Sequence, residues 1–434
     1  MRKKEIVKSL IREFHHRPFP DFITRELNIP TDLDKIITLI GPRRSGKTFQ
    51  LYQLAANLQD KAGKTFLIFI NFEDERLTLD FRDLDLILQA YRELYPGNSP
   101  ANCYFFFDEI QNVSGWEKFI RRLYDTVSRH IFLTGSNAKM LSSEIATSLR
   151  GRSISYEILP LSFREYLLFK GIEYDWYVPE VQGQVYNALE SYIENGGFPE
   201  LVNIENESAR NRILQEYYQV MLFRDLVERY EIKNIVALKY FLKRLLASST
   251  KEVSVNRIYN DLKSAQIKIG KNSLYSFLDQ AESIFLVNSL KKFSDKLPVR
   301  ELGERKVFFI DTGLLNSLVY KFTADRGKAV EQIIYWELRR RQENIFFMKN
   351  GFECDFVTAS RGGDRKVTKA IQVCTDLSHT LTRARELKGL ITACRKLKIN
   401  RGMIVSFDEY ELIEEEGISV FIVPLPRFLC EEFA

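Results

Sequence analysis

The segment at residues 41–48, GPRRSGKT, constrains the fold of this chain more than any other feature. It matches the pattern G-x-x-x-x-G-K-[ST], which joins a buried strand to a helix in phosphate-binding loops. An apolar run at Ile36–Ile40 precedes it, and a stretch with helical periodicity at Lys47–Leu58 follows it. Backbone amides of such a loop and the N-terminus of the helix attract phosphate oxygens. We therefore expect a nucleotide to contact the residues Gly41, Pro42, Arg43, Arg44, Ser45, Gly46, Lys47, Thr48 and Phe49.

Lys47 and Thr48 have separate expected roles in this loop. The Lys47 ammonium group would reach the β- and γ-phosphates, and the Thr48 hydroxyl would hold Mg²⁺. A second run, YFFFDE, ends an aromatic strand with the carboxylates of Asp108 and Glu109. Asp108 is expected to bind Mg²⁺ through water, and Glu109 to orient and deprotonate the attacking water. The sequence contains no NKxD-type loop that would specify guanine, so ATP and Mg²⁺ are the expected ligands.

Two further positions are candidates for catalysis, each with a structural alternative. Asn137 follows the next strand, level with the expected γ-phosphate, and could equally be the N-cap of the following helix. Arg152 lies just before the fifth strand, where it or Arg150 could act in trans on the ATP of a neighbouring copy. A surface salt bridge is the alternative for this arginine.

The first 160 residues alternate between short apolar runs and helical stretches. Near-continuous apolar strands joined by helices are typical of a parallel sheet covered on both faces. The sequence therefore predicts an α/β core over residues 1–160, with strands at Ile36–Ile40, Phe66–Asn71, Tyr104–Phe107, Ile131–Thr134 and Ile154–Leu159. Residues 161–232 show only helical spacing, interrupted at Gly196-Gly197-Phe198-Pro199, where one helix must stop and another start.

Residues 233–320 have the order of a winged helix-turn-helix: three helices, then two strands separated by the basic tip KKFSDKLPVR. Between Lys233 and Lys306, 15 Lys and Arg face 7 Asp and Glu, a local charge of +8, whereas the rest of the chain sums to −3. Such a segment suits a phosphate backbone, although it could also be a solvated face. Our candidates for DNA contacts are Lys271, Asn272, Ser273 and Tyr275 on the third helix, and Lys291, Lys292, Lys296 and Arg300 on the wing.

The last hundred or so residues, 321–434, follow the order α-β-β-β-α-β. A helix at Arg326–Arg341 leads to strands on either side of an Asn350-Gly351 turn, a strong hairpin signal. A third strand, a helix at Thr380–Leu397 and a strand at Gly402–Phe407 complete the pattern, which predicts an α+β domain.

Composition excludes several other classes of protein. No apolar run approaches the roughly 20 residues of a membrane helix, and the charged N-terminus lacks the apolar core of a secretory signal. Five scattered cysteines and four histidines argue against a zinc module or a disulfide framework. We therefore expect a cytoplasmic protein without a membrane partner.

Together GPRRSGKT, FFFDEIQN, LTGSNAKMLSSEIATSLRGRSISYEILPLSFREYL and GGFPE resemble a group of archaeal and bacterial AAA+ ATPases. Members of that group carry a winged helix and a C-terminal domain of unknown function with a PD-(D/E)xK nuclease-like fold, here resembling a restriction endonuclease. The resemblance implies a P-loop ATPase core followed by a helical lid over the nucleotide at residues 161–232. It also implies that Gly197 and Pro199, in the lid, contact bound nucleotide.

The same resemblance maps a nuclease-like site onto Glu331, Asp355, Gln372 and Cys374. Gln372 is a neutral ligand where a carboxylate is usual, and Cys374 replaces a lysine. A thiol is mostly neutral at pH 7 and is a poor partner for Mg²⁺. We therefore expect a degenerate domain that binds or assembles rather than cleaves, with an active nuclease as the alternative.

The leading hypothesis is a Mg²⁺-dependent ATPase whose nucleotide state repositions a DNA-binding winged helix. A second hypothesis is a nucleotide-gated interaction module whose winged helix binds a protein, with hydrolysis only as a slow timer; a protein or a homo-oligomer is the corresponding partner. A third is an ATP-dependent nuclease.

Overall fold

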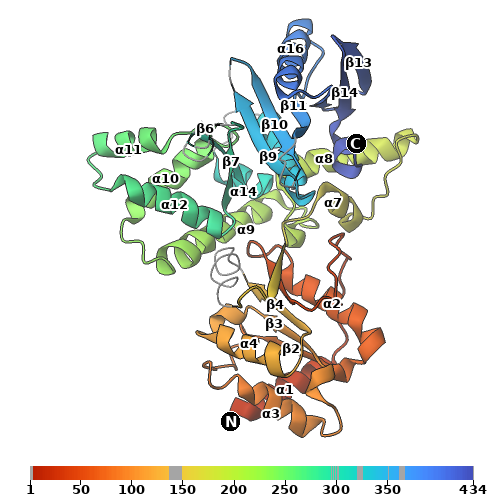
Figure 1. Cartoon of the computed structure of the whole chain (residues 1–434), viewed down its shortest axis with the longest axis vertical. Helices are drawn as coiled ribbons and strands as arrows, with labels where there is room; N and C mark the ends of the chain where they lie inside the picture. The colour runs from red at the N-terminus through yellow and green to blue at the C-terminus, as the bar shows by residue number, and fades with distance from the viewer. Residues whose placement is uncertain are drawn as a thin grey trace. The chain divides into compact units, whose positions relative to one another are not determined.

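The computed structural model describes residues 3–135, 149–294, 296, 298, 300, 303–319, 326–349, 351–360 and 367–433 (Figure 1). The chain divides into two compact units. Residues 1–159 with 283–285 form the first unit, and residues 160–282 with 286–434 form the second unit.

A parallel sheet of five strands, in the order β2-β3-β4-β1-β5, is the centre of the first unit. The prediction of a parallel α/β core is thereby confirmed. In this order β1 lies between β4 and β5, so that the loop after β1 emerges beside the end of β4. The strands are β1 (Ile36–Ile40), β2 (Leu67–Asn71), β3 (Tyr104–Asp108), β4 (Ile131–Gly135) and β5 (Ser153–Glu157), and the helices α1 (Lys3–His16), α2 (Lys47–Ala62), α3 (Asp85–Leu94) and α4 (Trp116–Thr126).

Alternate residues of β3 point to opposite faces of this sheet, and a helix covers each face. Phe106 belongs to the apolar cluster that contains Leu51 and Leu54 of α2, whereas the ring of Phe107 contacts Phe119 of α4. The two helices lie on opposite sides of the sheet in Figure 1. Burial on both faces explains why the strand is aromatic throughout.

The second unit begins with helices, as the absence of strand patterns in residues 161–232 predicts. They are α7 (Phe163–Phe169), α8 (Pro179–Asn195), α9 (Glu207–Val220) and a π-helical extension at Met221–Glu228. The short helix α14 (Thr312–Leu318) packs against α8 and α9. A Cβ atom on Gly313 would lie 2.0 Å from the carbonyl oxygen of Asn195, so only glycine permits this close approach.

Three helices and a three-stranded antiparallel sheet, β6-β8-β7, follow within the described part of the second unit. They are α10 (Ile235–Ala247), α11 (Val255–Ser264), α12 (Lys271–Ser283), β6 (Glu252–Val253), β7 (Val287–Lys291) and β8 (Arg305–Phe309). Beyond β7 the backbone N–H of Phe293 donates to the carbonyl of Phe347, 2.7 Å away, on the C-terminal sheet. The two sheets are therefore joined by backbone pairing.

The C-terminal sheet has the order β13-β14-β12-β11-β10-β9. Its elements are α15 (Arg326–Arg340), β9 (Asn344–Lys349), β10 (Glu353–Ala359), β11 (Val367–Val373), α16 (Thr380–Leu397), β12 (Arg401–Ser406), β13 (Glu411–Glu415), β14 (Ile418–Pro424) and α17 (Leu425–Cys430). The first six occur in the predicted order, and the last three were not predicted. Leu390 and Cys394 of α16 pack on Ile404 of the sheet.

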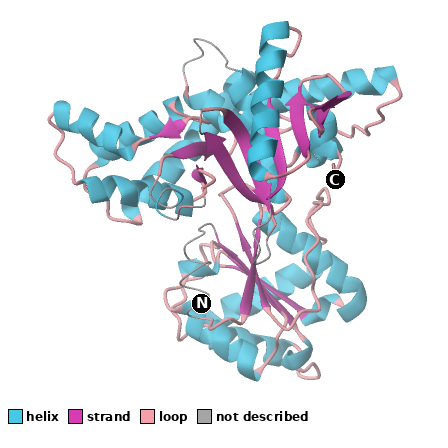
Figure 2. Cartoon of the chain, turned by 45° about the horizontal axis from the view of Figure 1, so that its top comes forward, coloured by secondary structure: helices cyan, strands magenta, loops and turns pink. Residues whose placement is uncertain are grey.

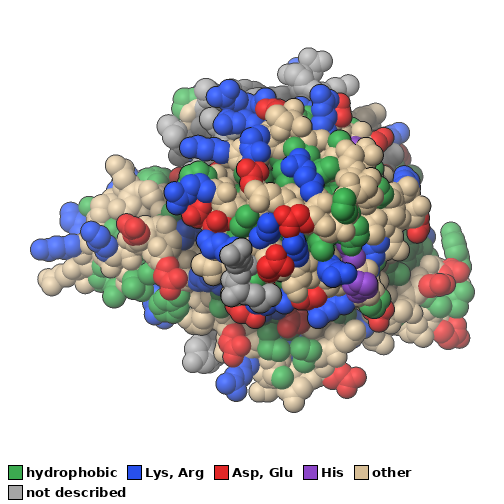
Figure 3. Space-filling model, turned by 90° about the horizontal axis from the view of Figure 1, so that it is seen from below, with side chains coloured by type: hydrophobic (Ala, Val, Ile, Leu, Met, Phe, Trp, Pro, Cys, Tyr) green, Lys and Arg blue, Asp and Glu red, His purple; other side chains and the backbone are tan. Residues whose placement is uncertain are grey.

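Figure 2 shows how helices surround the strands of each unit. Basic and acidic side chains are interspersed on the face of the molecule shown in Figure 3. No helix among the described residues has the length and apolarity required to cross a membrane. All five cysteines are free thiols.

Candidate functional site

The loop between β1 and α2 has the backbone that its sequence pattern requires. A Cβ atom on Gly41 would lie 2.1 Å from the carbonyl oxygen of Ile158, so no other residue fits there. Gly46, with φ at 96°, has a left-handed backbone and immediately precedes the first residue of α2. Both glycines therefore permit the tight turn between β1 and α2. This turn places backbone amides beside the N-terminus of α2, where phosphate oxygens are favoured.

Lys47 is buried inside this loop. Its ammonium nitrogen donates to the carbonyls of Pro42 at 2.9 Å and Gly41 at 3.2 Å, and lies 3.8 Å from Oε1 of Glu109. Burial lowers the pKa of Lys47, and the nearby carboxylates of Glu109 and Asp108 oppose that effect. The loop thus encloses the end of the Lys47 side chain. Phosphate oxygens of a nucleotide would replace the carbonyls of Gly41 and Pro42 as acceptors of its hydrogen bonds.

Asp108 lies at the end of β3 and accepts two hydroxyl hydrogen bonds. Thr48 donates to Oδ2 at 2.8 Å and Thr134 donates to Oδ1 at 2.6 Å. Burial raises the pKa of Asp108 to about 6, although these hydroxyls favour its charged form. The carboxylate and the Thr48 hydroxyl are oxygen ligands of the kind that Mg²⁺ prefers, so the residues present fit the metal that the loop implies.

Glu109 has a left-handed backbone, with φ at 53° and ψ at 42°. Its N–H donates to the Thr134 hydroxyl at 2.8 Å, and its carboxylate accepts a hydrogen bond from the Gln111 amide. Thr134 thus holds both carboxyl residues at once. The sequence placed Thr134 only at the end of an expected strand, Ile131–Thr134, and did not identify Gln111.

The remaining residues assigned to this site are less closely tied to it. Arg43 lies 3.6 Å from Glu73, and Phe49 is half exposed beside Tyr52. Arg152 pairs with Asp125 at 2.8 Å, which is the salt-bridge alternative considered for it. Asn137 lies outside the described residues.

Gly197 and Pro199 lie in the second unit, in the turn between α8 and α9. The Gly197 N–H donates to the buried carboxylate of Asp311 at 2.7 Å, which also accepts from the N–H of Leu314. Burial raises the pKa of Asp311 to about 6. Within its own unit, the turn is therefore held by a carboxylate that the sequence did not single out.

The candidates for DNA contacts separate into two groups. Lys271, Asn272, Ser273 and Tyr275 are all exposed on α12. On the expected wing, Lys296 is exposed, whereas Lys291, Lys292 and Arg300 are partly buried. Lys292 also forms a parallel bridge with Phe347 of β9, so this part of the wing pairs with the C-terminal sheet.

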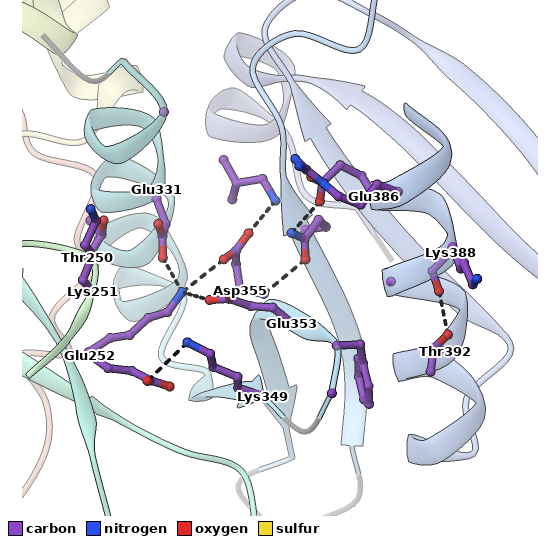
Figure 4. Close-up of a pocket in the computed structure, with 18 of the residues that line it drawn as sticks. Thr250, Lys251, Glu252, Glu331, Lys349, Glu353, Asp355, Glu386, Lys388 and Thr392 are labelled. Carbon is purple, nitrogen blue, oxygen red and sulfur yellow. Dashed lines mark hydrogen bonds and ion pairs between the residues drawn. The ribbon is translucent and has the colours of Figure 1, made fainter. Parts of the chain in front are cut away.

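The predicted nuclease-like residues lie around a cavity of about 1190 Å³ in the second unit (Figure 4). Glu331 comes from α15, Asp355 from β10 and Gln372 from β11, and all three line the cavity. Cys374 follows β11, and its thiol donates to the Asp376 carbonyl. The structure therefore brings together three of the four predicted positions.

A lysine that the sequence did not identify occupies the middle of this cluster. The Lys306 ammonium nitrogen lies 2.9 Å from Glu331, 3.1 Å from Asp355 and 3.3 Å from Glu353. Within the described residues no group of three or more His, Cys, Asp or Glu side chains is arranged to hold a metal ion. The donor set therefore does not fit the metal that a nuclease-like fold implies.

The matching family models identify the class of the first unit. Residues 33–167 match a family described as an AAA domain, and residues 186–325 match a domain of unknown function, DUF8612. The chain is 36% identical over 385 residues to the uncharacterized protein MJ1544 of Methanocaldococcus jannaschii, covering 87% of this chain and 83% of that protein. The chain belongs to the MJ1544 family. It is also 28% identical over 396 residues to an uncharacterized protein of Haemophilus influenzae, covering 90% and 94% of the two chains.

Solved structures of AAA+ proteins are more distant. AMPPCP-bound DnaA from Aquifex aeolicus is 14% identical with a TM-score of 0.26, over 64% of this chain and 86% of that one. The Aeropyrum pernix ORC1 protein in complex with DNA is 12% identical with a TM-score of 0.30, over 78% and 93%. TM-scores this low do not establish a shared arrangement of the whole chain.

Proposed function

We propose that the first unit binds ATP with Mg²⁺ and hydrolyses it. The observation that carries this proposal is the group formed by Lys47, Thr48, Asp108, Glu109 and Thr134 at the ends of β1, β3 and β4. The match of residues 33–167 to an AAA domain supports it. Bound Mg²⁺ would neutralise charge on the phosphates and orient them.

Each residue of the group has a distinct part in the proposed reaction. Lys47 would donate to phosphate oxygens in place of its carbonyl acceptors, and the oxygens of Thr48 and Asp108 would hold the metal. Glu109 accepts a proton from the attacking water, and the Thr134 hydroxyl fixes the backbone from which that carboxylate extends. Gln111, bonded to the Glu109 carboxylate, orients it.

Phosphate release by the full chain tests this assignment. Glu109→Gln should keep Mg·ATP binding and lower turnover by about 10²–10⁴-fold, because general base catalysis contributes that much. Lys47→Ala should weaken ATP binding by at least about tenfold, because it removes a charged hydrogen-bond donor. Asp60→Asn, exposed at the far end of α2, is the matched control. Equal turnover in Glu109→Gln and Asp60→Asn would remove Glu109 from its role.

We further propose that the nucleotide state controls a winged helix formed by α10 to β8, and that this module binds duplex DNA. The exposed residues at the start of α12 support the proposal, as does the local charge of +8 between Lys233 and Lys306. Side chains there are free to reach base edges, while lysines of the same segment neutralise phosphates. The lid role of residues 161–232, with Gly197 and Pro199 near the nucleotide, belongs to the same proposal.

Fluorescence anisotropy with a labelled duplex at several salt concentrations tests DNA binding. We expect affinity to fall steeply as salt rises, and the salt slope to decrease by about 1 in Lys271→Ala. Arg212→Ala, which removes an exposed charge on α9 of the same unit, should leave the slope unchanged. Absence of binding at low salt would instead favour a protein partner for this surface.

A further inference from the structure

We propose that the ammonium group of Lys306 takes the place of a divalent cation in the carboxylate cluster of the second unit. We call Lys306 with Glu331, Glu353 and Asp355 the ion-pair joint, because these ion pairs connect separate elements of the second unit. The joint takes no divalent cation in the intact protein. This inference is independent of the proposed ATPase and DNA-binding functions.

The positions of the charged atoms are the first argument. Lys306 extends from β8 and is 3% exposed. Its nitrogen lies within 3.3 Å of carboxylate oxygens from Glu331, Asp355 and Glu353. These carboxylates converge on one point from α15 and β10, as Figure 4 shows. A buried ammonium requires such partners, because an uncompensated buried charge is very costly.

Short ion pairs surround the Lys306 ammonium group on the side of the cavity. Its nitrogen lies 2.9 Å from Glu331, 3.1 Å from Asp355 and 3.3 Å from Glu353, so it fills the point that these carboxylates share. A metal ion would therefore have to approach a fixed positive charge at the point where its ligands converge. Like charges at this separation repel strongly in a buried site.

The other atoms expected to hold a metal are already hydrogen-bonded within the protein. Oδ2 of Asp355 accepts from the Val373 N–H at 3.1 Å. The side-chain oxygen Oε1 of Gln372 accepts from the Asp355 N–H at 3.3 Å, and its side-chain nitrogen Nε2 donates to Glu386 at 2.9 Å. Gln372 lines the cavity, but both polar ends of its side chain are engaged within the protein, where they help to position Asp355.

Access does not explain the exclusion of a metal. Glu331, Glu353, Asp355 and Lys306 all line the cavity of about 1190 Å³, which is large enough for a hydrated ion. Lys306 thus excludes a metal by occupying the centre itself. Removal of its charge should leave a group of carboxylates that a divalent cation can reach.

The joint also has a structural consequence. Lys306 belongs to the small sheet β6-β8-β7, and its partners belong to α15 and the C-terminal sheet. A second ion pair, between Glu252 of β6 and Lys349 of β9 at 3.3 Å, joins the same two sheets. The cluster therefore connects parts of the chain that the sequence pattern assigned to separate domains.

Mn²⁺ binding to the nucleotide-free full chain, followed by electron paramagnetic resonance and calorimetry, tests the proposal. Wild type and Asp355→Asn should bind the same number of Mn²⁺ ions, because the centre takes none while Lys306 is present. Lys306→Met should gain one site, at least about tenfold tighter than any site at this position in wild type. The double variant Lys306→Met/Asp355→Asn should lose that site, which separates it from Mn²⁺ bound in the first unit.

Two results would overturn the proposal. One is a wild-type Mn²⁺ site that disappears in Asp355→Asn, and the other is a folded Lys306→Met protein that gains no site. If Lys306→Met fails to fold, the wild-type comparison with Asp355→Asn decides the question alone. Lys306→Arg, which keeps the charge, should fold and should not gain a Mn²⁺ site.

Discussion

Thr134 connects the two carboxyl residues of the proposed nucleotide site. Its hydroxyl donates to Asp108 and accepts from the Glu109 N–H, so one small side chain serves both. Thr134→Val keeps the shape of the side chain and removes both hydrogen bonds. We expect a loss of about 1–3 kcal/mol in the free energy of unfolding, because a buried N–H is left without its acceptor.

Urea unfolding and ATP turnover measure the effect of this variant. Turnover should fall as well, since both carboxyl groups lose their support, whereas Thr134→Ser keeps the hydroxyl and should resemble wild type. A valine variant as stable and as active as the serine variant would contradict this role for Thr134.

Residues of the nucleotide site could be predicted because the chemistry depends on a contiguous pattern. The loop with Lys47 and the aromatic strand ending in Asp108 and Glu109 are local signals, and the structure brings them together. Lys306 could not be predicted, because its partners Glu331 and Asp355 lie 25 and 49 residues away. The available signal is a pair of basic residues, Arg305 and Lys306, at the start of an otherwise apolar strand.

At the scale of elements, the turn after α8 is tightly constrained. Gly196 has φ at 76° and ψ at −169°, a region open almost only to glycine. A Cβ atom there would lie 2.0 Å from Oδ1 of Asp311, the carboxylate that also caps α14. Gly196→Ala should therefore cost about 2–4 kcal/mol of stability through strain and the lost cap.

Gly183→Ala is the matched comparison for that prediction. Gly183 lies on the exposed side of the same helix, and a Cβ atom there meets nothing within 4 Å. It should stabilise the protein by up to about 1 kcal/mol, because alanine favours a helix. Thermal unfolding of both variants checks the pair, and a similar effect of the two would contradict the constraint at Gly196.

Most helices and strands follow from periodicity, and the exceptions have physical reasons. The strands β1 to β4 are mostly buried on both faces and read as nearly continuous apolar runs, such as Tyr104–Phe107, whereas the edge strand β5 is more exposed. β13 was not predicted because it is an edge strand with mostly exposed, acidic residues. Because β13 was not predicted, the hairpin that it forms with β14 was not predicted either. The boundaries at 232/233 and 320/321 stay predictions.

At the scale of the whole molecule, the division into two units predicts separate unfolding. Calorimetry of the full chain should show two transitions, because the first unit (1–159 with 283–285) and the second unit (160–282 with 286–434) have largely separate cores. A non-hydrolysable ATP analogue with Mg²⁺ at 100 times its Kd should stabilise the first unit by about 2.7 kcal/mol. This corresponds to an upward shift of about 5–10 °C in one transition only.

Lys47→Ala provides the control for this experiment, since it should abolish the shift and leave the other transition unchanged. A single transition that moves as a whole on addition of nucleotide would contradict separate unfolding of the units.

The backbone pairing of Phe293 with Phe347 has a consequence for how such a protein could transmit motion. The segment that follows β7 pairs with β9 through its backbone. The small sheet that follows α12 is therefore joined to the C-terminal sheet. A rotation driven by nucleotide could not move the proposed DNA-binding surface of α12 by itself. The C-terminal sheet would have to rotate together with α12 as one rigid part.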